Sequence, residues 1–331
     1  MASQSTVEDG WQDPPCQVVD LGTDKGRGLF ATRDIPSGHV YFRAQPFTIV
    51  VCQEWVRNVC VGCMTFTPTH TMKVRCACAC TFYCSDACRD SDHARHSVEC
   101  AAFGRLAIAL RGISREDLFI FKTQARFVIS LLASKRDLER RVPPSDASSE
   151  NGASVLDRAI SQAALAAPPT VADMLSLVSN RAKYDKDQKT MQMWRDVCAL
   201  VRSATPELIT ESDEAVIDII CREECNSFGF WDDGDELYAY GLFPHASYFN
   251  HDCAPNTFKF TKGRDVFFRS IKPLKAGDEL FISYVLVSDH TELRRQQLME
   301  TYQFMCQCSR CVAGVRHSYY FYIVFYMRHL Y

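Results

Sequence analysis

The sequence predicts an α+β fold in which one β-rich unit is interrupted by a cysteine-rich module and a helical segment, and closed by a second group of cysteines. Three observations predict it. Short β-prone runs occur in two separate stretches, 16–51 and 226–288. Between them lie a cysteine-dense stretch, 52–104, with little apolar periodicity, and a stretch of helical periodicity, 105–225. Three closely spaced cysteines follow within 289–313.

The first β-rich stretch follows a polar segment, 1–15, that we expect to be disordered. Its apolar and β-branched runs are short, and Asp34–Gly38 supplies a turn between two of them. The runs that we expect to be strands are Gln17–Val19, Gly28–Phe30, His39–Phe42 and Phe47–Val51.

In the middle of the chain, the spacing of the apolar residues changes from that of strands to that of helices. Apolar residues recur at helical spacing over Phe103–Leu138 and again over Met174–Cys225. Between them, 143–170 is rich in Ser, Ala, Pro and acidic residues, which predicts a surface linker with at most one short helix near 155–165.

The second β-rich stretch contains strand-like runs at Val266–Phe268 and Leu280–Tyr284, the latter after a Lys-Ala-Gly-Asp turn. One helix is predicted over Thr291–Tyr302. The final segment, 314–331, is rich in Tyr and Phe and has no recognisable role.

Composition narrows the class of protein. The 331 residues are 47% hydrophobic, carry a net charge of −3 and have a pI near 6.3, which excludes a globally basic nucleic-acid binder. Seventeen cysteines, with no secretory signal in the first ten residues, favour a reducing compartment. The apolar run Tyr319–Met327 is far shorter than the roughly 20 residues that span a bilayer. We therefore expect a cytoplasmic or nuclear protein without a membrane segment.

The cysteine-dense stretch has the spacing of metal ligands. Cys60-x2-Cys63 is followed by Cys84-x3-Cys88 and His96-x3-Cys100. Zinc prefers thiolate and imidazole ligands in closely spaced pairs. Eight ligands make two zinc sites, and three further cysteines are available between the pairs to complete the second: Cys76, Cys78 and Cys80. The alternative, a set of buried free thiols, explains this pairing poorly.

A third metal site is predicted from two separate segments. The segment Asn250–Asn256 contains Cys253, and about fifty residues later the chain offers Cys306, Cys308 and Cys311. These four thiolates would complete a tetrahedral zinc site that pins the later segment against the loop carrying Asn250 and His251.

The cysteine-dense stretch resembles a MYND zinc finger, a family in which ligand pairs alternate between two metals. The resemblance assigns Cys60, Cys63, Cys84 and Cys88 to one zinc, and His96 and Cys100 to the other, with Cys76 and Cys78 favoured over Cys80 as their companions. Two features depart from the family. The middle cysteines are separated by single residues, and His93 replaces a tryptophan that helps shape the peptide-binding surface.

The order of the remaining motifs is similar to the SET-domain lysine methyltransferases. These motifs are Lys25–Phe30, Gly241–Pro244 with Asn250–Asn256, and Gly277–Tyr284, followed by Cys306, Cys308 and Cys311. With a MYND finger between the first strands and the helices, the chain is identified as a member of the SET and MYND domain family over residues 16–313. The resemblance implies a β-rich SET fold with a pseudoknot, a post-SET zinc clip, three zinc ions, S-adenosylmethionine as methyl donor and a protein lysine as acceptor.

The resemblance also implies roles for residues. Tyr284 takes the position of the tyrosine that orients the reacting groups at the floor of the lysine channel. Asn250 and His251 match the pair that grips the cofactor, with His251 as a polar contact rather than a base. The cofactor-binding set implied by position is Lys25, Gly26, Arg27, Asn226, Ser247, Asn250, His251, Tyr302 and Phe304. No motif locates a cofactor contact within the helical insertion.

Three functions compete. The first is an active methyltransferase, which we expect to be a monomer and to act on a histone tail or another lysine-containing peptide. The second is an inactive scaffold and transcriptional co-regulator whose MYND module binds a protein partner. A sequence-specific DNA binder lacks the necessary basic and aromatic stretch. The match stops at Cys311, whereas larger members continue into a helical C-terminal domain, which we expect this chain to lack.

Overall fold

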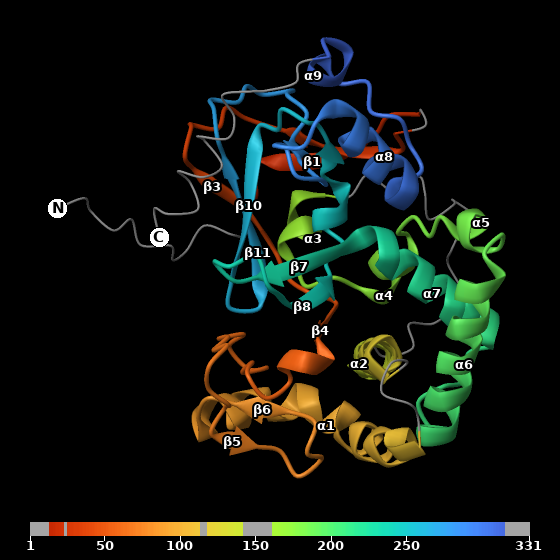
Figure 1. Cartoon of the computed structure of the whole chain (residues 1–331). Helices are drawn as coiled ribbons and strands as arrows, with labels where there is room; N and C mark the ends of the chain where they lie inside the picture. The colour runs from red at the N-terminus through yellow and green to blue at the C-terminus, as the bar shows by residue number, and fades with distance from the viewer. Residues whose placement is uncertain (1–12, 23–24, 113–117, 142–160, 315–331) are drawn as a thin grey trace, which may run out of the picture.

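The computed structural model describes residues 13–22, 25–112, 118–141 and 161–314 (Figure 1). Most of the predicted disordered N-terminus, the linker up to residue 160 and the tail beyond Gly314 lie outside the described residues. Within the described residues, no helix has the length and apolar character needed to cross a membrane.

The strands and helices follow the predicted alternation of β-rich, cysteine-rich, helical and β-rich stretches. The strands are β1 (Cys16–Asp20), β2 (Arg27–Ala31), β3 (Val40–Ala44), β4 (Thr48–Val51), β5 (Val74–Arg75), β6 (Phe82–Tyr83), β7 (Ser227–Trp231), β8 (Leu237–Leu242), β9 (Asn250–His251), β10 (Thr257–Lys262), β11 (Asp265–Ser270) and β12 (Phe281–Ile282). The helices are η1 (Gln53–Trp55), α1 (Asp86–Ala109), η2 (Leu110–Gly112), α2 (Leu118–Arg141), α3 (Gln162–Ala166), α4 (Val171–Leu175), α5 (Arg181–Tyr184), α6 (Gln188–Ala204), α7 (Asp213–Asn226), η4 (Ala246–Tyr248), α8 (Thr291–Tyr302) and α9 (Ser309–Val312).

The two β-rich stretches combine into one unit, as the sequence predicts. β1 pairs with β2, β3 joins β11 and β10, and β4 pairs with β8, which also pairs with β7. Strands from before and after the insertions therefore share sheets. Their buried faces meet around Phe42, Phe249 and Phe268, and the last two rings stack 4.2 Å apart. Burying such aromatic side chains contributes roughly 1.5–3 kcal/mol each.

The segment carrying the Asn-His pair lies beside the strand that leads to Tyr284. β9 and β12 are parallel, with Asn250 opposite Phe281. The side chain of Asn256 fixes this arrangement, because its amide nitrogen donates to the Glu279 carbonyl at 2.7 Å and its oxygen accepts from the Phe281 backbone N–H at 2.8 Å. The strand predicted over 280–284 is shorter than expected, since the chain leaves the ladder after Ile282.

The helices form a second hydrophobic core beside the sheets (Figure 1). α1, α2, α6 and α7 pack together, and α2 also packs on β4. Phe127, Trp194, Val197 and Ile217 are almost fully buried there. α1 is continuous from Asp86 to Ala109, so the metal-binding module and the helical insertion share one helix rather than meeting at a break near residue 104.

The end of the predicted linker differs from a surface connection. Leu165 in α3 is buried in the β-rich unit, and the side-chain amide of Gln162 donates to the Thr32 hydroxyl at 2.8 Å. The Ser/Ala/Pro composition concealed this, because one buried leucine on a five-residue helix gives no periodic signal.

Candidate active site and metal clusters

The structure brings the twelve sequence-predicted metal ligands together in three groups of four. Within each group the candidate ligand atoms all lie within 4.8 Å of one another. A tetrahedral zinc with Zn–S bonds of 2.3 Å places its sulfur atoms about 3.8 Å apart. The observed separations fit this value: 3.8 Å for Cys63–Cys84, 3.5 Å for Cys76–Cys100 and 3.9 Å for Cys253–Cys306. The groups are Cys60, Cys63, Cys84 and Cys88; Cys76, Cys78, His96 and Cys100; and Cys253, Cys306, Cys308 and Cys311.

The second group contains Cys76 and Cys78, and not Cys80. A turn makes the single-residue spacing workable, because the Ala79 N–H donates to the Cys76 carbonyl at 2.9 Å and Ala79 adopts φ 63°. Cys80 lies beyond this turn, where its thiol faces the Phe103 carbonyl at 3.5 Å. His93, three residues before His96 on α1, is exposed.

The third group is joined to the candidate cofactor site through His251. The Tyr284 backbone N–H donates to His251 Nδ1 at 3.0 Å, so the ring proton is on Nε2, which lies 3.2 Å from Cys253 Sγ. Burial and the nearby Arg294 guanidinium lower the pKa of His251 to about 4. A neutral histidine with both nitrogens engaged is suited to positioning rather than to proton transfer.

Asn250 connects three parts of the site. Its amide nitrogen donates to the Glu279 carboxylate at 2.8 Å and to the Arg27 carbonyl at 3.2 Å. These bonds tie β9 to β2 and to the segment before β12. The close approach also explains Gly28 at this point, because a Cβ there would lie 2.9 Å from Glu279 Oε1.

Three aromatic residues that the sequence placed at the site form one group. Tyr284 and Tyr302 have ring centroids 4.6 Å apart, and His251 lies 5.3 Å from Tyr284 and 6.0 Å from Phe304. The Tyr284 hydroxyl donates to the Phe249 carbonyl at 2.6 Å. Gln303 ends α8 in the left-handed conformation at φ 62°, which turns the chain so that Phe304 joins the group.

The remaining predicted cofactor residues differ in their exposure and in their hydrogen-bond partners. Lys25 and Gly26 are exposed at the β1–β2 turn, and a Cβ on Gly26 would meet nothing within 4 Å. The Arg27 guanidinium donates to the Ser176 carbonyl at 2.7 Å and lies over the Tyr248 ring. Ser247 turns its hydroxyl back to the Phe243 carbonyl at 3.2 Å.

Sequence reasoning missed the segment 176–180 after α4. Besides the contact from Arg27, its Val178 carbonyl accepts from the side-chain amide of Asn226 at 2.8 Å. Asn180 follows at φ 47°, a left-handed conformation that asparagine tolerates. The segment lies between two predicted cofactor residues, and this asparagine before a short helix is the one local signal that could have marked it.

Comparisons with known proteins identify the family of the chain and several relatives. A family model of the SET domain matches residues 26–285. A SET and MYND domain-containing protein of Dictyostelium discoideum is 25% identical over 323 residues, covering 87% of this chain and 78% of its own length. The N-lysine methyltransferase SMYD2-A of Xenopus laevis is 27% identical over 287 residues, covering 87% of this chain and 58% of its own.

The histone-lysine N-methyltransferase ASHR1 of Arabidopsis thaliana is 27% identical over 298 residues, covering 89% of this chain and 55% of its own length. The chain thus spans less than two thirds of the two relatives named as methyltransferases. The match over residues 26–285 covers most of the chain and includes Asn250, His251 and Tyr284. The chain belongs to the SET domain family, with the SET and MYND domain-containing proteins among its relatives.

Proposed function

We propose that this chain is a protein-lysine N-methyltransferase that uses S-adenosylmethionine. The observation that carries the proposal is the hydrogen-bonded hydroxyl of Tyr284. It is held by the Phe249 carbonyl within an aromatic group that is linked through His251 to the Cys253 cluster. Two relatives bear the names of lysine methyltransferases, which supports the same reaction.

The residues present fit the cofactor. When bound, S-adenosylmethionine supplies an electrophilic methyl group on a sulfonium centre. The half-buried rings of Tyr302 and Phe304 offer apolar faces suited to adenine. The exposed Lys25 and the open backbone at Gly26 are suited to a carboxylate. Since the Arg27 guanidinium bonds to Ser176, we assign Arg27 to holding segment 176–180 beside the site.

Tyr284 acts by position and polarity. Burial raises the pKa of its phenol well above the ordinary value, so the hydroxyl stays protonated and donates to Phe249. Its oxygen lone pairs remain available to orient the reacting groups. Methyl transfer needs an uncharged lysine amine, and desolvation of the substrate lysine beside these rings favours the neutral form. The protein therefore mainly positions the reactants and excludes water.

We assign three structural zinc ions to the clusters. Each cluster provides four protein ligands, which leaves no open coordination position for catalysis. All seventeen cysteines lie in the described residues and none forms a disulfide, which suits a reducing compartment such as the cytosol or nucleus. We expect a monomer that acts on a histone or another protein lysine.

Transfer of a tritiated methyl group from S-adenosylmethionine to mixed histones and to whole-cell lysate proteins tests the proposal. Wild type should label at least one protein, and Tyr284→Phe should label it more slowly by on the order of 10²-fold. Tyr238→Phe, which changes a buried tyrosine in the β-rich unit, is the matched control and should retain labelling. Failure of wild type to label any histone or lysate protein would favour the scaffold. Equal labelling by Tyr284→Phe would remove Tyr284 from its role.

A further inference from the structure

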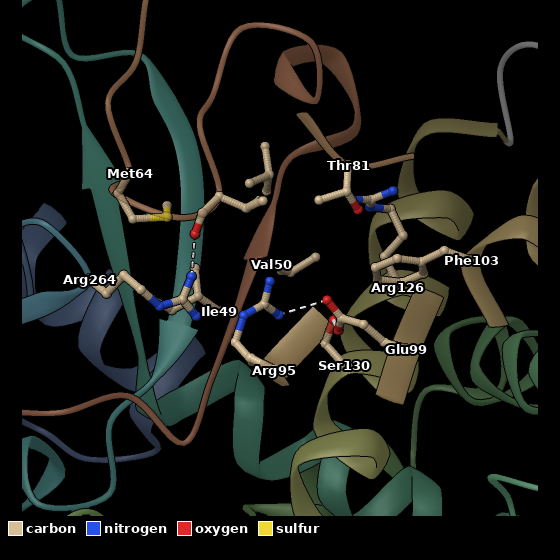
Figure 2. Close-up of a pocket in the computed structure, with 12 residues that line it drawn as sticks. Ile49, Val50, Met64, Thr81, Arg95, Glu99, Phe103, Arg126, Ser130 and Arg264 are labelled. Carbon is tan, nitrogen blue, oxygen red and sulfur yellow. Dashed lines mark hydrogen bonds and ion pairs between the residues drawn. The ribbon is translucent and has the colours of Figure 1, made fainter. Parts of the chain in front are cut away.

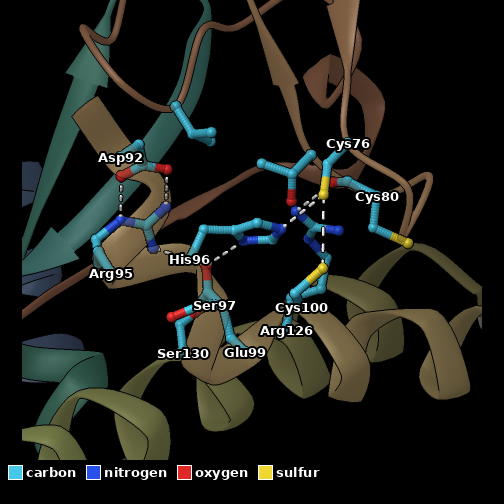
Figure 3. Close-up of polar contacts among 12 residues, drawn as sticks. Cys76, Cys80, Asp92, Arg95, His96, Ser97, Glu99, Cys100, Arg126 and Ser130 are labelled. Carbon is cyan, nitrogen blue, oxygen red and sulfur yellow. Dashed lines mark hydrogen bonds and ion pairs between the residues drawn. The ribbon is translucent and has the colours of Figure 1, made fainter. Parts of the chain in front are cut away.

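The buried side of α1 is unusually polar between Asp92 and Glu99. Asp92, His96 and Glu99 (Figure 3) are all buried. They occupy the side of the helix that continues into the apolar Phe103 and Leu106. Buried charges are costly unless they are paired. The partners of these three residues therefore show what this polar stretch of the helix holds in place.

His96 belongs to the second cysteine cluster through one nitrogen only. Its Nε2 lies 3.2 Å from Cys76 Sγ and 3.5 Å from Cys78 Sγ. Its Nδ1 lies 3.2 Å from Glu99 Oε1. Because a carboxylate can only accept, this contact places the ring proton on Nδ1 and leaves the Nε2 lone pair directed at the thiols. A histidine that binds a metal needs this tautomer.

Glu99 also connects the cluster to α2. Its Oε2 accepts from the Ser130 hydroxyl at 2.6 Å, and its Oε1 accepts from Arg95 at 2.6 Å. One turn before Ser130, Arg126 donates to the Cys80 carbonyl at 3.1 Å and stacks on the Phe103 ring. Two residues of α2, at i and i+4, thus face the metal-binding module.

The space between these elements is small and strongly charged (Figure 2). A cavity of about 10 Å³, room for one water molecule, is lined by Arg95, Arg126 and Arg264 as well as Glu99 and Ser130. Arg126 is 5% exposed, and its Nε has no hydrogen-bond partner among the described residues. Three thiolates and one imidazole around Zn²⁺ carry a net charge of −1. The occupied cluster would therefore supply negative charge near the buried Arg126.

We infer that Glu99 is a positioning residue for the second metal cluster: it holds His96 in the metal-binding tautomer and, through Ser130, clamps the cluster to α2. The inference rests on the proposal that this cluster binds zinc, and it is independent of methyl transfer. Metal occupancy then stabilises the contact between the module and the helix that packs on β4. The module is in this way part of the support for the β-rich unit.

The zinc content and the rate of zinc release test whether Glu99 positions His96. Wild type should contain three zinc ions per chain by elemental mass spectrometry. In Glu99→Ala, transfer of one of the three to a chromogenic chelator should be 10- to 100-fold faster, with the other two unchanged. Glu99→Gln keeps an acceptor for Nδ1–H and should restore part of the retention. Glu139→Gln, which changes an exposed glutamate on α2, is the control.

Hydrogen exchange in α2 tests the clamp. Ser130→Ala keeps the Glu99–His96 contact, so it should release zinc at close to the wild-type rate while exchange over 126–133 becomes faster. Wild-type zinc release from Glu99→Ala, and from Glu99→Gln if the alanine variant does not fold, would overturn the positioning role. Unchanged exchange in Ser130→Ala would overturn the clamp. A wild-type content of two zinc ions or fewer would instead refute zinc at this cluster.

Discussion

Removal of one buried carboxyl group should stabilise the protein, and more so at higher pH. Glu223 lies on α7, three residues before Asn226, and is 6% exposed. One of its oxygens accepts from the Ser227 hydroxyl at 3.1 Å, and the other has no partner among the described residues. Burial, and then repulsion from Glu224, raise the pKa of Glu223 from 4.5 to about 8. Glu223→Gln retains the shape of the neutral acid and cannot ionise.

The direction and the size of this stability change follow from proton linkage. Above pH 4.5 the unfolded chain loses this proton, whereas the folded protein keeps it up to about pH 8, so the unfolded state binds fewer protons. Stability then falls as pH rises between these values, by about 1.4 kcal/mol per pH unit. The variant avoids this loss. Its advantage over wild type should be about 3 kcal/mol at pH 7 and about 5 kcal/mol above pH 8.

Thermal unfolding of zinc-loaded wild type and variant at pH 6, 7 and 8 measures the effect. With 2–4 °C per kcal/mol for a large domain, the gain in Tm should be roughly 5 °C greater at pH 8 than at pH 6. Glu300→Gln, a change on the exposed face of α8, serves as the control. A Tm difference that does not change with pH would refute the reasoning, because it would mean that Glu223 titrates alike in the folded and unfolded states.

Three further changes test other parts of the site. Cys253→Ser should remove one zinc and weaken binding of S-adenosylhomocysteine by on the order of 10-fold in calorimetry, because His251 and Arg294 both contact this sulfur. Cys198→Ser, at a buried thiol outside the clusters, is the control. An unchanged affinity in Cys253→Ser would show that the third cysteine cluster does not support the cofactor site. Asn256→Ala breaks the hydrogen bonds to Glu279 and Phe281 and should lower the free energy of unfolding by about 3 kcal/mol in chemical denaturation. A loss below about 1 kcal/mol would show that these two hydrogen bonds are dispensable. Arg27→Lys loses the planar contact with Tyr248 and should lower stability by about 1–2 kcal/mol in the same assay, with an unchanged unfolding curve as the contradicting result.

The sequence predicted the features that depend on local spacing. Paired cysteines can share a metal only at short separations, so Cys60-x2-Cys63 and Cys84-x3-Cys88 indicated a cluster without any knowledge of the fold. The helix over 291–302 has the bounds expected from its pattern. The pairing of Cys253 with the later thiols was predicted from the number of thiols that a tetrahedral zinc needs, although the two segments are about fifty residues apart.

Features that depend on tertiary contacts were not predictable in this way. The polar side of α1 breaks the apolar stripe that normally marks a buried helix face, because a buried metal cluster and ion pairs replace apolar contacts there. The role of segment 176–180 rests on backbone carbonyls, which every residue type provides. The sequence likewise does not reveal that the Arg27 guanidinium donates to the Ser176 carbonyl.

The continuity of α1 limits how the protein can be divided. A fragment that ended near residue 104 would keep His96 and Cys100 but would lose Leu106, and its Phe103 would be left on an uncovered surface. It would also lack Ser130 of α2, whose hydroxyl donates to the Glu99 carboxylate. Such a fragment would be prone to aggregate and would hold its metal more weakly than the intact chain does. Partner-binding assays with the isolated module would therefore report on a surface that the intact chain never presents.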